Sequence, residues 1–206
     1  MVFETNVFIN CPFDKEYKPI LKAIIFCLIY FDYNPLLSET INSAESRINS
    51  IQYLINNAKY SIHDLSRMKA KRKNELARFN MPFELGMDIG CKRFGSDLHN
   101  SKFLLILDQE RYRYQQSISD LAGNDIAIHN NEPEKAIRQI RNWLRKLNGT
   151  QIDTSANKIW LLYNEFIGDF YQITVEDNLI EDDIDEMPWN EYCEYIRNWI
   201  TGKRIQ

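Results

Sequence analysis

The sequence predicts an α/β fold: a five-stranded parallel sheet with helices on both faces, in the flavodoxin-like order 2-1-3-4-5, followed by a C-terminal helical appendage. Two observations predict this fold. Short apolar runs typical of strands buried on both faces alternate five times with segments whose apolar residues recur every three or four positions. After Gly149 the alternation stops and only helical patterns follow. Strands that alternate with helices join through right-handed crossovers, which place helices on both faces of the sheet.

Five segments have the pattern of strands. The first, Asn6–Asn10, is short and largely apolar, and it runs directly into Cys11 and Pro12. The clearest is 102–107, in which five consecutive apolar residues are followed by Asp108. The other three expected strands cover residues 35–37, 60–62 and 126–129.

The segments between these strands have helical periodicity. Residues 80–94 are expected to form a helix capped by Asn80, with Pro82 in its first turn, where a missing N–H costs nothing, and Gly95 just past its end. Ser43 is the expected cap of the preceding helix. The remaining helices expected in this part of the chain cover residues 15–31, 44–58 and 134–147.

The chain is expected to divide into an α/β domain at residues 1–149 and a helical appendage at residues 150–206. Two helices, 159–171 and 189–200, are expected in the appendage, and the acidic stretch 181–186 separates them. The appendage either packs on the core of the α/β domain or offers a surface to a partner.

Composition narrows the class of partner. The chain has 206 residues, of which 44% are hydrophobic and 13% aromatic, so a packed core is well supplied. Lys and Arg number 25 against 29 Asp and Glu, and the resulting net charge of −4 argues against electrostatic capture of nucleic acid. A small molecule is the expected partner.

No membrane partner is expected, and the predicted location is the cytoplasm. The longest apolar stretch, 23–31, is much shorter than the roughly 20 residues of a membrane span, and the N-terminus lacks the pattern of a signal peptide. The four cysteines form no CxxC pair, so neither a metal site nor a disulfide framework is indicated, and most of them are expected to be buried.

Polar residues gather where the predicted strands end, and these ends share one edge of a parallel sheet. Ligands of such sheets bind beyond the carboxyl ends of the strands, where the strand order reverses. The sequence therefore predicts a polar cleft there. The segments at this edge are 10–14, 38–39, 63–67 and 108–112.

Glu84 is the candidate that stands out near this edge. It lies close to the start of the helix 80–94, where a carboxylate also interacts favourably with the helix dipole, by roughly 0.3–1 kcal/mol. Gly86 and Gly90 each cost a helix about 1 kcal/mol relative to Ala, which predicts close approach of a neighbouring backbone or a ligand.

Several other polar residues have two interpretations. A His that closes a buried strand, such as His63, is more often a hydrogen-bonded structural residue than a general acid or base. The basic run 69–73 is read as a solvated loop in preference to a nucleic-acid patch. The segment 111–114, Arg-Tyr-Arg-Tyr, either binds a base or phosphate or forms an exposed loop.

Three segments together resemble the superfamily that contains nucleoside 2-deoxyribosyltransferases and Toll/interleukin receptor (TIR) domains. Residues 7–14, an aliphatic run that ends in a Pro-containing loop, resemble its first strand and ligand loop. Residues 44–62 resemble its helix-then-strand segment, and Phe-Glu-Leu-Gly at 83–86 is similar to the transferase pattern of a catalytic Glu followed by Gly. The likeness covers about residues 5–145.

The resemblance implies that Glu84 acts on the bond between a ribose and its base, in NAD or a related nucleotide that is substrate or ligand, with no separate cofactor. It implies Glu84 and Asp64 as catalytic residues and a phosphate contact from Arg67 or Arg78. A bacterial antiphage or stress setting is typical of stand-alone relatives. The substrate-binding residues implied are Asn10, Cys11, Pro12, Phe13, Asp14, His63, Ser66, Arg67 and Arg78.

Two alternatives to an enzyme stay open. The cleft can sense a nucleotide without breaking it while the appendage passes the signal on, or the chain can be a scaffold that forms a homo-oligomer through its helices, as TIR domains do. The sequence lacks the Asp-x-Gly stretch that often precedes the transferase Glu and the Ser, Trp and Cys residues around the Glu of many TIR domains. These departures leave the substrate open.

Overall fold

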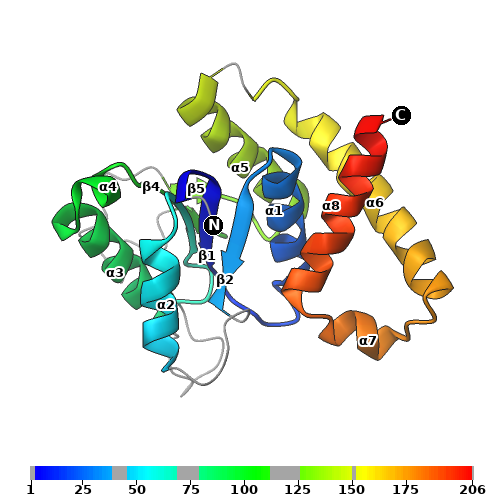
Figure 1. Ribbon diagram of the computed structural model, residues 1–206, viewed down its shortest axis with the longest axis horizontal. Helices are drawn as coiled ribbons and strands as arrows, with labels where there is room; N and C mark the ends of the chain where they lie inside the picture. Colours follow the sequence, from blue (N-terminus) through cyan, green and yellow to red (C-terminus); the bar gives the residue numbers. More distant parts are fainter. Residues whose placement is uncertain (1–2, 39–45, 69–78, 112–125, 150–151, 206) are drawn as a thin grey trace.

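The computed structural model describes residues 3–38, 46–68, 79–111, 126–149 and 152–205. Its sheet has five strands, all parallel, in the order β2-β1-β3-β4-β5 (Figure 1). The predicted fold class and strand order are confirmed. The strands are β1 (Asn6–Asn10), β2 (Asn34–Leu37), β3 (Tyr60–Asp64), β4 (Phe103–Asp108) and β5 (Ile126–Ile128).

The two central strands are buried along their whole length. Every residue of β1 and of β3 is buried, as expected for strands that are covered on both faces. Their register pairs Asn10 with His63 at the carboxyl ends of the two strands. The strand order reverses between β1 and β3, so this edge is the position at which open α/β sheets bind ligands.

Helices cover the two faces of the sheet as two separate layers (Figure 1). On one face α1 (Lys18–Tyr30) packs against α5 (Pro133–Asn148), and on the other α2 (Arg47–Asn56) packs against α3 (Asn80–Phe94). The short helix α4 (Asp97–Asn100) follows α3. The α1 layer lies over the main apolar core, whereas α2 and α3 cover two smaller apolar clusters.

The C-terminal helices pack on the α/β part. They are α6 (Ala156–Glu176), α7 (Glu181–Glu186) and α8 (Trp189–Ile205), and α1 contacts both α6 and α8. The ring of Phe26 in α1 lies 5.5 Å from that of Phe166 in α6 and 6.0 Å from that of Trp199 in α8, centroid to centroid. Of the two arrangements expected for the appendage, the structure therefore has the packed one.

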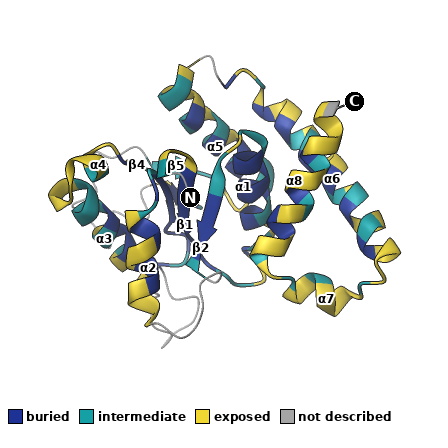
Figure 2. Cartoon of the chain, in the orientation of Figure 1, coloured by how far each residue is buried: buried dark blue, intermediate teal, exposed yellow. Residues whose placement is uncertain are grey.

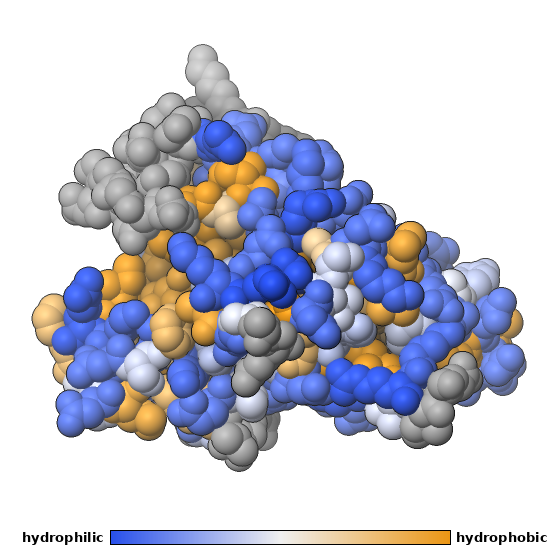
Figure 3. Space-filling view, turned by 90° about the horizontal axis from the view of Figure 1, so that it is seen from above, coloured by the Kyte–Doolittle hydropathy of each residue, from blue (hydrophilic) through white to orange (hydrophobic). Residues whose placement is uncertain are grey.

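The packing of α1 explains the long apolar stretch in the sequence. Figure 2 shows α1 as a largely buried helix between the sheet and the C-terminal helices. A helix covered on nearly all sides needs apolar residues all round. Within the described residues, no helix combines the length and the apolar character that a membrane span requires. On the face seen in Figure 3, hydrophilic residues cover much of the described surface and apolar residues are exposed between them.

Some predicted boundaries and caps need correction. Residue Asn80 is the first helical residue of α3 and Phe79 takes the cap position, so the predicted Asn cap is wrong by one residue. The helix α2 is preceded by Ser46, while Ser43 lies outside the described residues. The strand β3 continues past its expected end to Asp64, because buried partners satisfy the polar side chains of its last two residues.

The shared core predicts that the C-terminal helices and the α/β part unfold together. Truncating the fully buried Phe166 to Ala is expected to lower the free energy of unfolding by about 3–5 kcal/mol in a single urea transition. Leu161→Ala on the same helix is the control, because Leu161 is 56% exposed and is expected to cost well under about 1 kcal/mol. Two separate transitions in the wild type would contradict a shared core.

Candidate functional site

A side-chain hydrogen bond connects the carboxyl end of β1 to the start of α3. The side-chain amide of Asn10 donates to the carbonyl of Met81 (2.9 Å) and to Nδ1 of His63 (3.0 Å). These two contacts bring the ends of β1 and β3 and the first turn of α3 together. The predicted site residues Asn10, His63 and Glu84 therefore belong to one region, whereas Arg78 lies outside the described residues.

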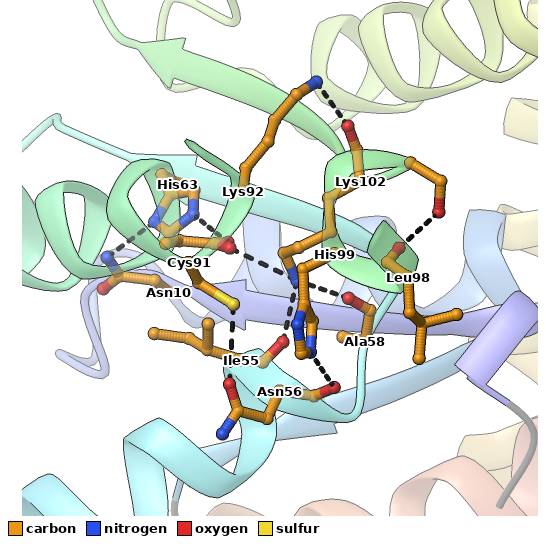
Figure 4. A network of polar contacts seen from close by, with 12 residues as sticks. Asn10, Ile55, Asn56, Ala58, His63, Cys91, Lys92, Leu98, His99 and Lys102 are labelled. Carbon is orange, nitrogen blue, oxygen red and sulfur yellow. Dashed lines mark hydrogen bonds and ion pairs between the residues drawn. The ribbon is translucent and has the colours of Figure 1, made fainter. Parts of the chain in front are cut away.

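A buried polar chain continues from His63 into the sheet and α2 (Figure 4). Because Nδ1 of His63 accepts from Asn10, its proton is on Nε2, which donates to Asp88 of α3 (3.0 Å). The other oxygen of Asp88 lies 3.2 Å from the ammonium of Lys102. That ammonium also donates to the carbonyls of Ile55 (2.7 Å) and Ala58 at the end of α2. We name Asn10, His63, Asp88 and Lys102 the β1–α3 network.

The β1–α3 network is balanced in charge although its ionisable side chains are fully buried. Burial raises the pKa of Asp88, but the hydrogen bond from His63 and the charge of Lys102 outweigh this effect, so the net pKa is lowered. The carboxylate thus stays ionised beside one ammonium, and His63 serves as a hydrogen-bonded structural residue. The network fixes α3 against β1, β3 and α2.

A second buried group surrounds Asp64. One oxygen of Asp64 accepts from the hydroxyl of Tyr17 (2.7 Å) and faces Nε2 of His129 (2.9 Å), and the other accepts from the backbone N–H of Ser66 (2.8 Å). Burial raises the pKa of Asp64, yet the hydrogen bonds from His129, Ser66 and Tyr17 lower it by more. Both oxygens therefore have partners within the protein.

Asp64, His129 and Ser66 do not form a nucleophile triad. The Ser66 hydroxyl lies 3.0 Å from the same ring nitrogen, Nε2, that faces Asp64. The other ring nitrogen, Nδ1, accepts from the backbone N–H of Asn131 (3.0 Å), so the proton of the neutral ring is on Nε2. In a catalytic triad the serine and the carboxylate contact opposite ring nitrogens of the histidine. The nitrogen that faces the serine carries no proton, so that it can accept the proton of the serine hydroxyl. The geometry here is that of a structural hydrogen-bond group.

Arg67 is held by the loop between β1 and α1. Its guanidinium donates two hydrogen bonds to the carboxylate of Asp14, at 3.0 and 3.1 Å, and approaches Glu16 at 3.4 Å. The carboxylate of Asp14 also accepts from the N–H of Tyr17. Phosphate binding by Arg67 stays a prediction, and it would compete with this bidentate pair.

Glu84 differs from every carboxylate described above. It is 5% exposed and lies on the buried face of α3 with Met81 and Asp88, and no hydrogen bond or ion pair to it is found among the described residues. Burial raises its pKa to about 7, although the charge of Arg47 on α2 pulls the pKa down. At neutral pH this carboxyl group is therefore divided between its protonated and ionised forms.

The two glycines near Glu84 do not pack against a neighbouring backbone of the described residues. A Cβ added at Gly86 or at Gly90 would meet no heavy atom within 4 Å among the described parts of the chain. No backbone in the described ranges approaches α3 at these positions, so the expected approach of a neighbouring backbone is not found there, and the approach of a ligand stays a prediction.

The remaining predicted contact residues belong to the loop after β1. Cys11 is buried, and three of the four cysteines are buried, as expected. Pro12 and Phe13 line a cavity of about 420 Å³ beside α1. A cavity of about 830 Å³ lies apart from this region, between α3 and α5 at the β4–β5 edge, with apolar walls that include Phe103 and Trp143. Of the segment 111–114, only Arg111 is described.

Four members of these buried groups were missed from the sequence: Tyr17, Asp88, Lys102 and His129. Asp88 had a signal, since it falls one turn after Glu84 on the buried face of α3. Lys102 was read as the start of a strand and His129 as the end of one, because their partners are distant in the chain. Within the described ranges, no group of His, Cys, Asp and Glu could hold a metal ion.

Comparison of the chain with protein-family models, with curated proteins and with solved structures finds no match. The resemblance to deoxyribosyltransferases and TIR domains is accordingly carried by the sequence segments alone, and the chemistry of the site has to be argued from its geometry.

The β1–α3 network predicts strong coupling between Lys102 and Asp88. Lys102→Met leaves Asp88 buried without its cation and is expected to lower the free energy of unfolding by about 3–5 kcal/mol. Asp88→Asn combined with Lys102→Met is expected to cost clearly less than the sum of the single variants, measured by urea unfolding. Additive losses would mean that the two side chains do not interact.

The raised pKa of Glu84 predicts a stability cost that grows with pH. Below the unfolded pKa of 4.5 the group is protonated in both states, and stability is lost as pH rises toward about 7. Relative to Glu84→Gln, the free energy of unfolding of the wild type is expected to fall by about 1–2 kcal/mol between pH 5 and pH 8. This figure is smaller than the full pKa shift implies, because solvent partly screens the carboxyl group. A stabilising helix-dipole role predicts the opposite, a variant less stable than the wild type at pH 8.

Proposed function

We propose that the chain is an enzyme that cleaves the ribose–base bond of NAD or a related nucleotide, with Glu84 as its catalytic carboxylate. The observation that carries the proposal is a buried carboxyl group without an ion pair in the described residues, on a helix whose start is bonded to the end of β1. This position lies beside the strand-order reversal, where folds of this class bind ligands.

The alternative helix-dipole role for Glu84 is weakened by two features. The first turn of α3 contains no acidic residue, because Glu84 is the fifth residue of the helix, whereas the dipole interaction falls off within the first turn. Interaction with the dipole would also lower the pKa of the carboxyl group, and the pKa is raised. A group that is buried at a cost to stability is typical of functional sites.

The proposed chemistry uses the charge of ionised Glu84. As the bond from the anomeric carbon to the base nitrogen breaks, its electron pair leaves with the base and positive charge develops on the ribose. A carboxylate close to that carbon stabilises the charge, most effectively in a site that excludes water. From NAD the base leaves as neutral nicotinamide without needing a proton. Water then adds to the anomeric carbon and releases a proton, or another acceptor takes the ribosyl group.

The proposal assigns different roles to the two predicted catalytic residues. Glu84 has the role of the charged catalytic group. Asp64 has partners on both oxygens, so it is better suited to hold the loop after β3, and its direct action on substrate stays a prediction. A cytoplasmic location and a bacterial antiphage or stress setting belong to this proposal.

The test is turnover of NAD, NADP and a panel of nucleosides, followed by chromatography of the released base. Glu84→Gln is expected to lower kcat/KM by at least about 100-fold with the fold intact by circular dichroism, and Glu134→Gln on the surface of α5 is the control. Wild-type kcat/KM is expected to rise with pH with a midpoint near pH 7, as Glu84 ionises, and to level off about one pH unit higher. Unchanged turnover in Glu84→Gln would overturn the proposal.

A nucleotide sensor is the second candidate, and one observation favours it. The C-terminal helix α7 is ion-paired through Asp185 to Lys15 in the loop after β1 and to Lys18 at the start of α1. A ligand at that loop thus has a route to the C-terminal helices. Thermal stabilisation by a nucleotide with no product formed would favour this function over an enzyme.

A further inference from the structure

A cavity of about 420 Å³ separates the loop after β1 from the segment that joins α7 to α8. Its walls are made by two parts of the chain that are about 170 residues apart in sequence. Lys15 and Lys18 contribute ammonium groups, while Phe13, Met187 and Trp189 contribute apolar surface. The cavity therefore combines two cations with aromatic walls.

The two lysines share a single carboxylate. The ammonium of Lys15 lies 3.2 Å from one oxygen of Asp185, and that of Lys18 lies 3.8 Å from the other and also donates to the Asp185 carbonyl. A hydrogen bond and charge from Lys15, followed by the charge of Lys18, lower the pKa of Asp185. Glu186 also lines the cavity, but the ion pairs found among the described residues join both lysines to Asp185. This carboxylate supplies one negative charge to two ammonium groups, so a dianionic group matches the pair better.

This ion pair is readily exchanged for another anion. The side chain of Lys15 is 87% exposed and that of Asp185 is 44% exposed, and exposed pairs of this kind contribute little to stability. An anion that reaches the lysines therefore competes with Asp185 at low cost. Because Asp185 belongs to α7, the competition links the cavity to the position of that helix.

The cavity is close in the chain to the candidate catalytic region. Pro12 and Phe13 line it, and they follow Asn10, which bonds to α3, by only two and three residues. The loop after β1 therefore adjoins both the cavity and the contact with α3. The aromatic walls offer stacking surface to the ligand, and the lysines offer charge to a phosphate.

We propose that this cavity binds the phosphate-bearing part of a nucleotide through Lys15 and Lys18, and that Asp185 competes with the phosphate for the same two lysines. The inference deepens the proposed function, on which its choice of a nucleotide rests. By linkage, any change that weakens the Asp185 contact strengthens phosphate binding, and phosphate binding loosens α7 to the same extent.

The test is titration calorimetry of the full chain with AMP, adenosine and inorganic phosphate at low salt. AMP is expected to bind at least about tenfold more tightly than either of the others, because both the lysines and the aromatic walls take part. Lys18→Gln is expected to weaken AMP binding by about fivefold or more, and Asp185→Asn to strengthen it about two- to fivefold. The matched controls, Lys158→Gln on α6 and Asp182→Asn on α7, are expected to leave the affinity unchanged.

Several outcomes would overturn the inference. Adenosine or inorganic phosphate could bind as tightly as AMP, or Lys18→Gln could leave the affinity for AMP unchanged. Asp185→Asn could also leave the affinity for AMP unchanged or lower it. Failure of the proposed function would look different. AMP binding with the expected dependence on Lys18 and Asp185, but no turnover of any nucleotide, supports the cavity and contradicts the enzyme. Turnover that depends on Glu84, with AMP affinity indifferent to both variants, supports the enzyme and contradicts the cavity.

Discussion

The arrangement of the candidate site depends on the buried ion pair between Lys102 and Asp88. Lys102 precedes β4 and also donates to the carbonyl of Ile55 in the last turn of α2, while Asp88 belongs to α3 and binds His63 of β3. Such a pair adds little stability compared with apolar residues of the same size, but the loss of one partner is costly. Its effect here is on position: it joins α3 to two strands and to α2, and α3 carries Glu84.

The carboxylates around the end of β1 divide into two kinds. Asp64 and Asp88 are fully buried and hydrogen-bonded, and their partners lower their pKa despite burial. Glu84 is nearly as buried, and its pKa is raised to about 7. Within the described part of the chain Glu84 has no ion pair. A carboxyl group buried without a partner adds no stability to a fold, but it can stabilise positive charge in a site. This contrast between neighbouring carboxylates is the physical basis for the proposed role of Glu84.

Much of the fold could be predicted from the sequence, because strands buried on both faces and amphipathic helices leave local patterns. The sheet order, the range 80–94 of α3 and the edge that holds Asn10, His63 and Asp64 were predicted in this way. The partners of these residues could not be predicted. Folding brings Lys102 to Ile55 and His129 to Asp64, and these pairs are too far apart in the sequence for a local pattern to indicate the contact. The close neighbouring backbone expected at Gly86 and Gly90 is not found among the described residues, because a low helix propensity does not reveal what lies beside the helix.

The most direct test of this account is the pKa of Glu84 itself, measured by NMR titration of glutamate side-chain carboxyl carbons in the folded protein. The resonance of Glu84 is assigned as the one missing from Glu84→Gln. The account predicts a midpoint near pH 7, while the aspartate carboxyl carbons of Asp64 and Asp88 titrate below their ordinary range. A Glu84 midpoint at or below its ordinary value of 4.5 would contradict the account, because the carboxyl would then be solvated or paired.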